Sequence, residues 1–160
     1  MLHRSVDRSR ETELSREDIE FVFASCCDPN RPPLSIIPRC AARGIPEVSG
    51  SWVSTGGSPQ VMMIVLSQRW LVRRVCFRCD GVARVSLLID NAGRFAPSQR
   101  LGDATFTVFD LTDVPSEDPG GVVGKTLTLH FVSEPACDFF VVTELNIRAV
   151  SIAKEDESKK

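Results

Sequence analysis

The stretch TLTLHFV, residues 126–132, alternates polar and apolar side chains along its length. Leu127, Leu129 and Phe131 occupy every second position, and two threonines and a histidine fill the positions before and between them. Successive side chains of a β-strand point to opposite faces, so this pattern is typical of a strand with one buried and one solvated face. The stretch therefore predicts a half-buried antiparallel strand.

The same alternation recurs on the N-terminal side of this strand. In VARVSLLI, residues 82–89, every second residue from Ala83 is apolar, and Arg84 and Ser86 lie opposite that set. In VCFRC, residues 75–79, the period of two places three residues inward and two outward. Both stretches predict further strands of the same half-buried kind.

Five more segments bring the expected number of strands to eight; they span residues 20–25, 60–67, 104–111, 138–142 and 145–152. The segments between them are rich in the Pro, Gly, Asn and Asp that form turns, as in CDPNRPP, DNAG, PSEDPGG and SEPACD. No interior window shows the three-to-four spacing of a long amphipathic helix. The sequence therefore predicts an all-β fold, an antiparallel two-sheet sandwich of the jelly-roll kind.

The length of 160 residues fits one domain. Residues 1–18 and 154–160 mix both charges with almost no apolar periodicity, so we expect them to be flexible tails around a sandwich domain of residues 19–153.

The charge is nearly balanced, with 19 basic and 21 acidic residues. This balance argues against nucleic acid or an anionic membrane surface as the main partner, because both reward a clustered basic face. The longest apolar run, residues 61–66, is too short to insert across a membrane, and the first 20 residues have no apolar core typical of a secretory signal. We expect a soluble, intracellular protein.

Six cysteines could form disulfides or ligate zinc: Cys26, Cys27, Cys40, Cys76, Cys79 and Cys137. Inside a cell they are expected to be reduced thiols. In an extended VCFRC strand, Cys76 projects outward while Cys79 projects inward with Val75 and Phe77, so the two thiols cannot share a zinc ion unless the strand breaks. Buried apolar-like cysteines are therefore the favoured interpretation, and zinc is the alternative.

Two patterns resemble catalytic or nucleotide sites. In DPGGVVGKT, residues 118–126, Gly120 is one residue too close to the Gly-Lys pair for a P-loop, and a strand follows where a helix is required. His3 lies in the N-terminal tail and His130 on the expected solvent face, and no nucleophile motif accompanies them.

A third pattern is a cluster of carboxylates that could serve glycoside hydrolysis, formed by Asp110, Asp113, Glu117 and Asp118. A charged loop is the favoured interpretation of this cluster. We therefore expect no enzyme activity.

Trp52 lies in a run of Ser, Gly and Thr, where a loop aromatic is expected to plug the open end of a sandwich and donate its indole N–H to a backbone acceptor. The apolar strand VMMIVL follows at residues 61–66. If Val61, Met63 and Val65 fill the core, the other face must be covered either by another layer of the same chain or by a partner. Because no helix is available as cover, a partner-binding strip is the favoured interpretation. That strip consists of Met62, Ile64 and Leu66.

Four segments resemble the intraflagellar transport protein 25 family, also called small heat-shock-protein-beta-11-like, over about residues 20–153. They are FASCCDPNRPPLSII, SWVSTGGSPQVMMIVLSQRWLVRRV, ARVSLLI and FFVVTELNIRAVS. The matching motif positions are Ala24, Ser25, Cys26, Pro32, Pro33, Trp52, Val53, Thr55, Gly56, Pro59 and Gln60.

The resemblance implies a discoidin or galactose-binding type of jelly-roll. It also implies a non-enzymatic subunit of intraflagellar transport complex B, paired with a Rab-like small GTPase and other complex B subunits, in the cilium or flagellum and the cytoplasm. Members of that family carry an Asp-Gly-rich calcium loop before the tryptophan, whereas this sequence has PRCAARGIPEVSGSW. Only Glu47 and Glu144 could offer carboxylates, so calcium binding is expected to be lost or weak.

Two other functions remain open. One is a glycan-binding module, for which Trp52, Arg69 and Trp70 are the candidate contacts. The other is an adaptor of the same fold that acts outside the cilium.

Overall fold

The computed structural model describes residues 11–26, 30–38, 50–55, 59–90, 93–97, 99–101, 106–115 and 120–152. The strands are β1 (Glu11–Glu13), β2 (Ile19–Ala24), β3 (Ser51–Val53), β4 (Gln60–Asp80), β5 (Val82–Ile89), β6 (Arg94–Phe95), β7 (Gln99–Leu101), β8 (Phe106–Asp110), β9 (Val122–Ser133) and β10 (Val141–Ser151). Two 3₁₀ turns, η2 (Arg16–Asp18) and η3 (Pro33–Ile36), complete the secondary structure. No helix in these ranges has the length and apolar content that a membrane span requires.

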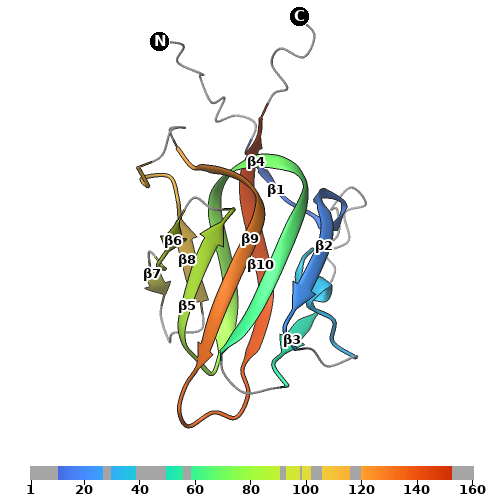
Figure 1. Cartoon of the computed structure of the whole chain (residues 1–160), viewed down its shortest axis with the longest axis vertical. Helices are drawn as coiled ribbons and strands as arrows, with labels where there is room; N and C mark the ends of the chain where they lie inside the picture. Colours follow the sequence, from blue (N-terminus) through green and yellow to red (C-terminus); the bar gives the residue numbers. More distant parts are fainter. Residues whose placement is uncertain are drawn as a thin grey trace, which may run out of the picture.

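The strands form the predicted antiparallel sandwich (Figure 1). One layer contains β2, the first part of β4, β9, β5 and β6. The other contains β1, β3, β10, the second part of β4, β8 and β7. β4 arches over one end of the molecule and belongs to both layers, so the long strand links the two sheets.

The alternation predicted for residues 126–132 is confirmed, because Leu127, Leu129 and Phe131 are fully buried. In β5 the buried set includes Val85, Leu87 and Ile89, as expected. Ala83 is only half-buried, because the β5–β9 register shifts between residues 82 and 84. A local bulge of this kind changes the face of a strand residue without changing the strand itself.

The prediction of which face of residues 61–66 is buried is wrong. Met62, Ile64 and Leu66 are fully buried, whereas Val61, Met63 and Val65 are half-buried on the outer face. The cause is the register of β4 with β9, in which Met62 is opposite Leu129. Directly paired residues share a face of the sheet, so Met62, Ile64 and Leu66 join the core side chains of β9. The proposed partner-binding strip is covered by the chain's own core.

Four of the expected strands combine in pairs, so that each pair forms one longer strand. Segments 60–67 and 75–79 both belong to β4, which continues through exposed Ser67, Gln68 and Arg69. The last two residues of segment 138–142 join segment 145–152 in β10, where Glu144 has a φ of 53° and the β4 register shifts, whereas residues 138–140 are not in a strand. These bulges keep the strands continuous while they bend.

The sandwich begins earlier than the expected boundary at residue 19. Glu11–Glu13 pairs with Arg148–Val150 of β10, and the backbone N–H of Leu14 donates to the carbonyl oxygen of Ile147 at 2.8 Å. The Leu14 side chain is buried in the core. Residues 11–18, taken as part of a flexible tail from their charges, therefore belong to the fold.

An aromatic cluster occupies the core near β3. The Trp52 ring meets Phe131 and Phe140 edge-on, both at 5.4 Å between ring centroids, and Phe131 stacks on Phe140 at 5.2 Å. Such pairs contribute about 0.5–1.5 kcal/mol each beyond the burial of their area. Trp52 therefore fixes β3 to β9 and to Phe140, the residue just before β10.

Candidate functional site

The motif residues around Trp52 form a structural network. The indole N–H of Trp52 donates to the carbonyl oxygen of Cys26 at 2.8 Å, which confirms the expected backbone acceptor. The Thr55 backbone N–H donates to the Cys26 thiol at 3.3 Å, and the Ser25 hydroxyl donates to the side-chain oxygen of Gln60. Because these groups bind one another, they tie β3 and the first residue of β4 to the end of β2.

The residues first considered for glycan contact do not form a site. Trp52 and Trp70 are both buried in the core, so neither ring offers a face to a ligand. Only Arg69 of the three is exposed, on the bend of β4.

A pocket of about 320 Å³ is lined by residues of the β4–β5 turn and the β9–β10 loop. Both of these connections lie at the end of the sandwich away from β1 (Figure 1). The pocket opens between them. Its lining residues are Asp80, Gly81, Ala136, Cys137, Asp138, Phe139 and Val141. We call it the loop pocket.

The walls of the loop pocket are held by backbone contacts. The Glu134 N–H donates to the Gly81 carbonyl oxygen at 2.8 Å, and the Cys137 N–H donates to the Glu134 carbonyl oxygen at 2.9 Å. Gly81 has a φ of 84°, and a Cβ there would lie 2.9 Å from the carbonyl oxygen of Phe139. A glycine is required at this turn, because it permits both the left-handed conformation and the close approach.

Phe139 gives the loop pocket an accessible aromatic ring. Its side chain is 57% exposed, more than any other large hydrophobic residue described. Phe140, next in the chain, packs against Trp52 in the core, so the alternation of the chain turns Phe139 outward. Phe139 was not predicted as a site residue, although the sequence carries a signal for it: two adjacent phenylalanines after a turn cannot both face the core.

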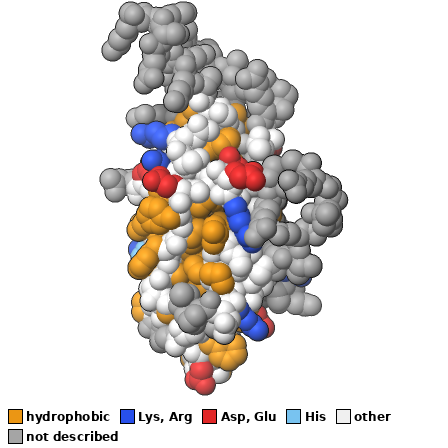
Figure 2. Space-filling view, turned by 90° about the vertical axis from the view of Figure 1, so that its right-hand side faces the viewer, with side chains coloured by type: hydrophobic (Ala, Val, Ile, Leu, Met, Phe, Trp, Pro, Cys, Tyr) orange, Lys and Arg blue, Asp and Glu red, His pale blue; other side chains and the backbone are white. Residues whose placement is uncertain are grey.

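Other exposed hydrophobic residues lie on the β2 side of the molecule. Phe21 and Phe23 of β2 are exposed and pair with Val65 and Met63 of β4. Figure 2, which faces this side, shows hydrophobic side chains gathered over the middle of the surface. The apolar outer face therefore exists, but different residues from those expected form it.

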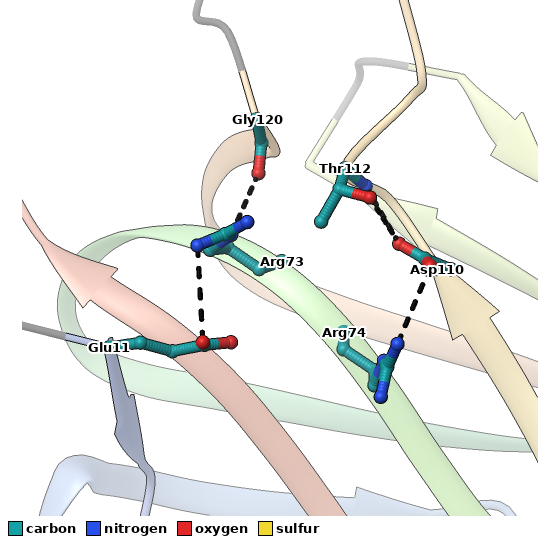
Figure 3. A network of polar contacts seen from close by, with 6 residues as sticks. All are labelled: Glu11, Arg73, Arg74, Asp110, Thr112 and Gly120. Carbon is teal, nitrogen blue, oxygen red and sulfur yellow. Dashed lines mark hydrogen bonds and ion pairs between the residues drawn. The ribbon is translucent and has the colours of Figure 1, made fainter. Parts of the chain in front are cut away.

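The carboxylate considered for hydrolysis in β8 is engaged in a polar network (Figure 3). Asp110 accepts hydrogen bonds from the Thr112 hydroxyl at 2.6 Å and the Thr112 backbone N–H at 3.0 Å, and it lies 3.5 Å from Arg74. The hydrogen bond from the Thr112 hydroxyl has the largest effect on the pKa of Asp110, and the bond from the Thr112 N–H has the next largest. Both lower this pKa from its ordinary value. A carboxylate held as an anion in this way is not a general acid.

Arg73 points to the other side of β4 (Figure 3). Its Nε donates to the Gly120 carbonyl oxygen at 3.1 Å, and its Nη1 lies 3.9 Å from Glu11. This arginine ties the loop before β9 and strand β1 to β4. Gly120 therefore lies in a turn that leads directly into β9. A strand at this place agrees with the sequence argument against a P-loop, which requires a helix there.

The two cysteines of VCFRC lie on opposite faces, as predicted. Cys79 is buried, with its sulfur 3.7 Å from the Thr107 hydroxyl, and Cys76 is half-buried on the outer face. Burial raises the pKa of the Cys76 thiol, so this thiol is a poor metal ligand at neutral pH. No group of three or more metal-ligating side chains occurs within the described ranges.

The calcium candidate Glu144 is paired with a cation. Its carboxylate lies 2.9 Å from the Nε of Arg78, which disfavours a metal at the same oxygens. His130 is half-exposed on the outer face of β9, as predicted. Seven residues singled out in the sequence lie outside the described residues: His3, Cys27, Cys40, Glu47, Gly56, Glu117 and Asp118.

No protein-family model matches the sequence, and no curated protein matches it. Solved structures share its fold. The family 32 carbohydrate-binding module of C. perfringens NanJ, solved with galactose, has a TM-score of 0.61 and 13% identity over 86% of this chain and 98% of that chain. Chitosan-binding module 1 from a Paenibacillus sp. IK-5 chitosanase/glucanase has a TM-score of 0.59 and 13% identity over 84% of this chain and 98% of that chain. The family 32 module of AlyQ, solved with 4,5-unsaturated mannuronic acid, has a TM-score of 0.54 and 18% identity over 81% of this chain and 95% of that chain.

The chain has the discoidin-like β-sandwich fold of these modules. The comparisons correct the rest of the family interpretation, because the similar structures are sugar-binding modules and nothing supports the intraflagellar transport protein 25 family. The expected roles in the cilium and flagellum are overturned, as is the pairing with a Rab-like GTPase and complex B subunits. The burial of Met62, Ile64 and Leu66 removes the physical argument for that pairing as well.

Proposed function

We propose that the chain is a non-catalytic glycan-binding module and that the loop pocket is its binding site. The observation that carries the proposal is the exposed ring of Phe139 beside the carboxylates of Asp80 and Asp138 in one concave surface. The sugar-binding modules that share the fold support the same class of ligand.

The chemistry of the loop pocket suits a sugar ring. A sugar presents an apolar C–H face together with hydroxyl groups around its edge. Phe139 offers an apolar surface for that face, and the two carboxylates can each accept several hydrogen bonds from hydroxyl groups. The volume of about 320 Å³ is at the small end of ligand pockets, so we expect one or two sugar units to be held.

The test is a glycan array followed by titration of each hit with the full chain. Phe139→Ala is expected to weaken binding at least about tenfold, which corresponds to about 1.4 kcal/mol. Phe23→Ala is the matched control, because Phe23 is 54% exposed but lies on β2, and its effect should be less than twofold. Equal losses in both variants, or an array with no hits, would refute the proposal.

Cys137 gives an independent measure of where the sugar binds. Cys137 is half-buried and lines the loop pocket, whereas the half-buried Cys26 lies outside that lining and its thiol accepts a hydrogen bond from the Thr55 backbone N–H. A bound sugar should slow the alkylation of Cys137 and leave Cys26 unchanged, as measured by peptide mass spectrometry. Slowing at neither or both thiols would contradict binding in the loop pocket.

A further inference from the structure

We infer that the loop pocket selects amino sugars that carry a free, protonated amino group over neutral and acidic sugars. This inference rests on the proposed function and adds the charge of the ligand to it. It follows from the charges that line the loop pocket.

The lining of the loop pocket is negatively charged. Asp80 and Asp138 are both exposed, and the other five lining residues are uncharged. Neither carboxylate has an ion-pair partner within the ranges that the structure describes. Both are therefore available to a cationic ligand, beside an aromatic ring whose face also attracts cations.

The surrounding chain leaves the negative charge of Asp80 and Asp138 in place. Residues 133–147 contain three acidic residues, Glu134, Asp138 and Glu144, and no lysine or arginine. Arg78 and Arg84 flank the β4–β5 turn, but neither lines the loop pocket. The Nε of Arg78 lies 2.9 Å from the carboxylate of Glu144, so that guanidinium is paired on the outer face of its sheet.

The expected preference follows from exposed ion pairs. Each pair between an exposed carboxylate and an ammonium group strengthens binding by about two- to fivefold, so two carboxylates give about tenfold together. An acidic sugar would be repelled by the same groups. Since exposed charges are screened by salt, the preference should shrink as ionic strength rises.

The experiment titrates the full chain with three oligosaccharides of equal length, made of glucosamine, N-acetylglucosamine or glucuronic acid. Glucosamine oligomers should bind about tenfold more tightly than N-acetylglucosamine oligomers at low salt and lose most of that advantage at about 1 M salt. The Asp80→Asn/Asp138→Asn double variant should bind both about equally. Asp113→Asn is the matched control, because Asp113 is exposed and lies outside the loop pocket.

The outcomes separate this inference from the proposed function. If N-acetylglucosamine or glucuronic acid oligomers bind as well as glucosamine oligomers, or if the double variant keeps the preference, the charge selection is wrong. Glycan binding that depends on Phe139 would then still stand. If no oligosaccharide or array glycan binds, the proposed function fails and the inference fails with it. Circular dichroism melting of each Asn variant establishes that it is folded.

Discussion

The indole N–H of Trp52 and the carbonyl oxygen of Cys26 form a 2.8 Å hydrogen bond that joins β3 to the turn after β2. Trp52 is fully buried, so this carbonyl would lose its indole donor if the tryptophan were replaced. The bond therefore connects the turn after β2 to the aromatic core at one point.

Trp52→Phe tests the contribution of this bond. Loss of the donor from a partly buried acceptor should reduce the free energy of unfolding by about 1 kcal/mol more than Trp70→Phe does. Trp70 is the matched control, because it is buried and its indole N–H has no acceptor within the described ranges. Urea denaturation measures both, and equal losses would show that the hydrogen bond contributes nothing.

Met62→Ala and Met63→Ala test which face of β4 is buried. Met62 is fully buried against the core and Met63 lies on the half-buried outer face, although the two are adjacent methionines. We expect Met62→Ala to reduce the free energy of unfolding by about 2–5 kcal/mol and Met63→Ala by less than about 1 kcal/mol. A larger loss for Met63→Ala than for Met62→Ala would mean that the face first expected from the sequence, with Met63, is the buried one.

Gly81→Ala tests the close approach in the wall of the loop pocket. Gly81 and Gly120 have φ values of 84° and 88°, but only at Gly81 would a Cβ meet another atom, the Phe139 carbonyl oxygen at 2.9 Å. Gly120→Ala should cost about 1–2 kcal/mol from left-handed strain, and Gly81→Ala about 1–3 kcal/mol more. Chemical denaturation gives the difference, and its absence would mean that the turn moves without cost.

The pKa of Asp110, measured by NMR titration, should lie below the ordinary value of 3.8. Thr112→Val removes the hydroxyl donor, the largest cause of the shift, and should raise this pKa more than Arg74→Gln does. Because the pKa is lowered in the folded state, Asp110 stabilises the fold above pH 3.8. That contribution is lost as the pH falls through the lowered value. A larger effect from Arg74→Gln would show that the ion pair dominates instead.

Much of the fold could be predicted because the period of two is a local property of the chain. Leu127, Leu129 and Phe131 could be assigned to the core from their spacing alone, and the opposite faces of Cys76 and Cys79 followed in the same way. The short strands β1, β3, β6 and β7 were not predicted, since two or three residues are too few to show a period.

The candidate site could not be predicted because it depends on contacts between distant segments. Asp80 and Phe139 are far apart in the sequence and meet only because Asp80 pairs with Val141 across β4 and β10. Phe139 faces outward because Phe140 takes the place against Trp52, and local alternation cannot say which of two adjacent phenylalanines does so.

By itself, the sequence determined that this chain is a β-sandwich, since alternating side chains carry that information at each strand. Only the tertiary structure decided which face of residues 61–66 is buried, because both faces are apolar and the choice comes from the pairing of Met62 with Leu129. The tertiary structure likewise brought two carboxylates and an exposed ring into one pocket, through strand pairing that no local pattern encodes.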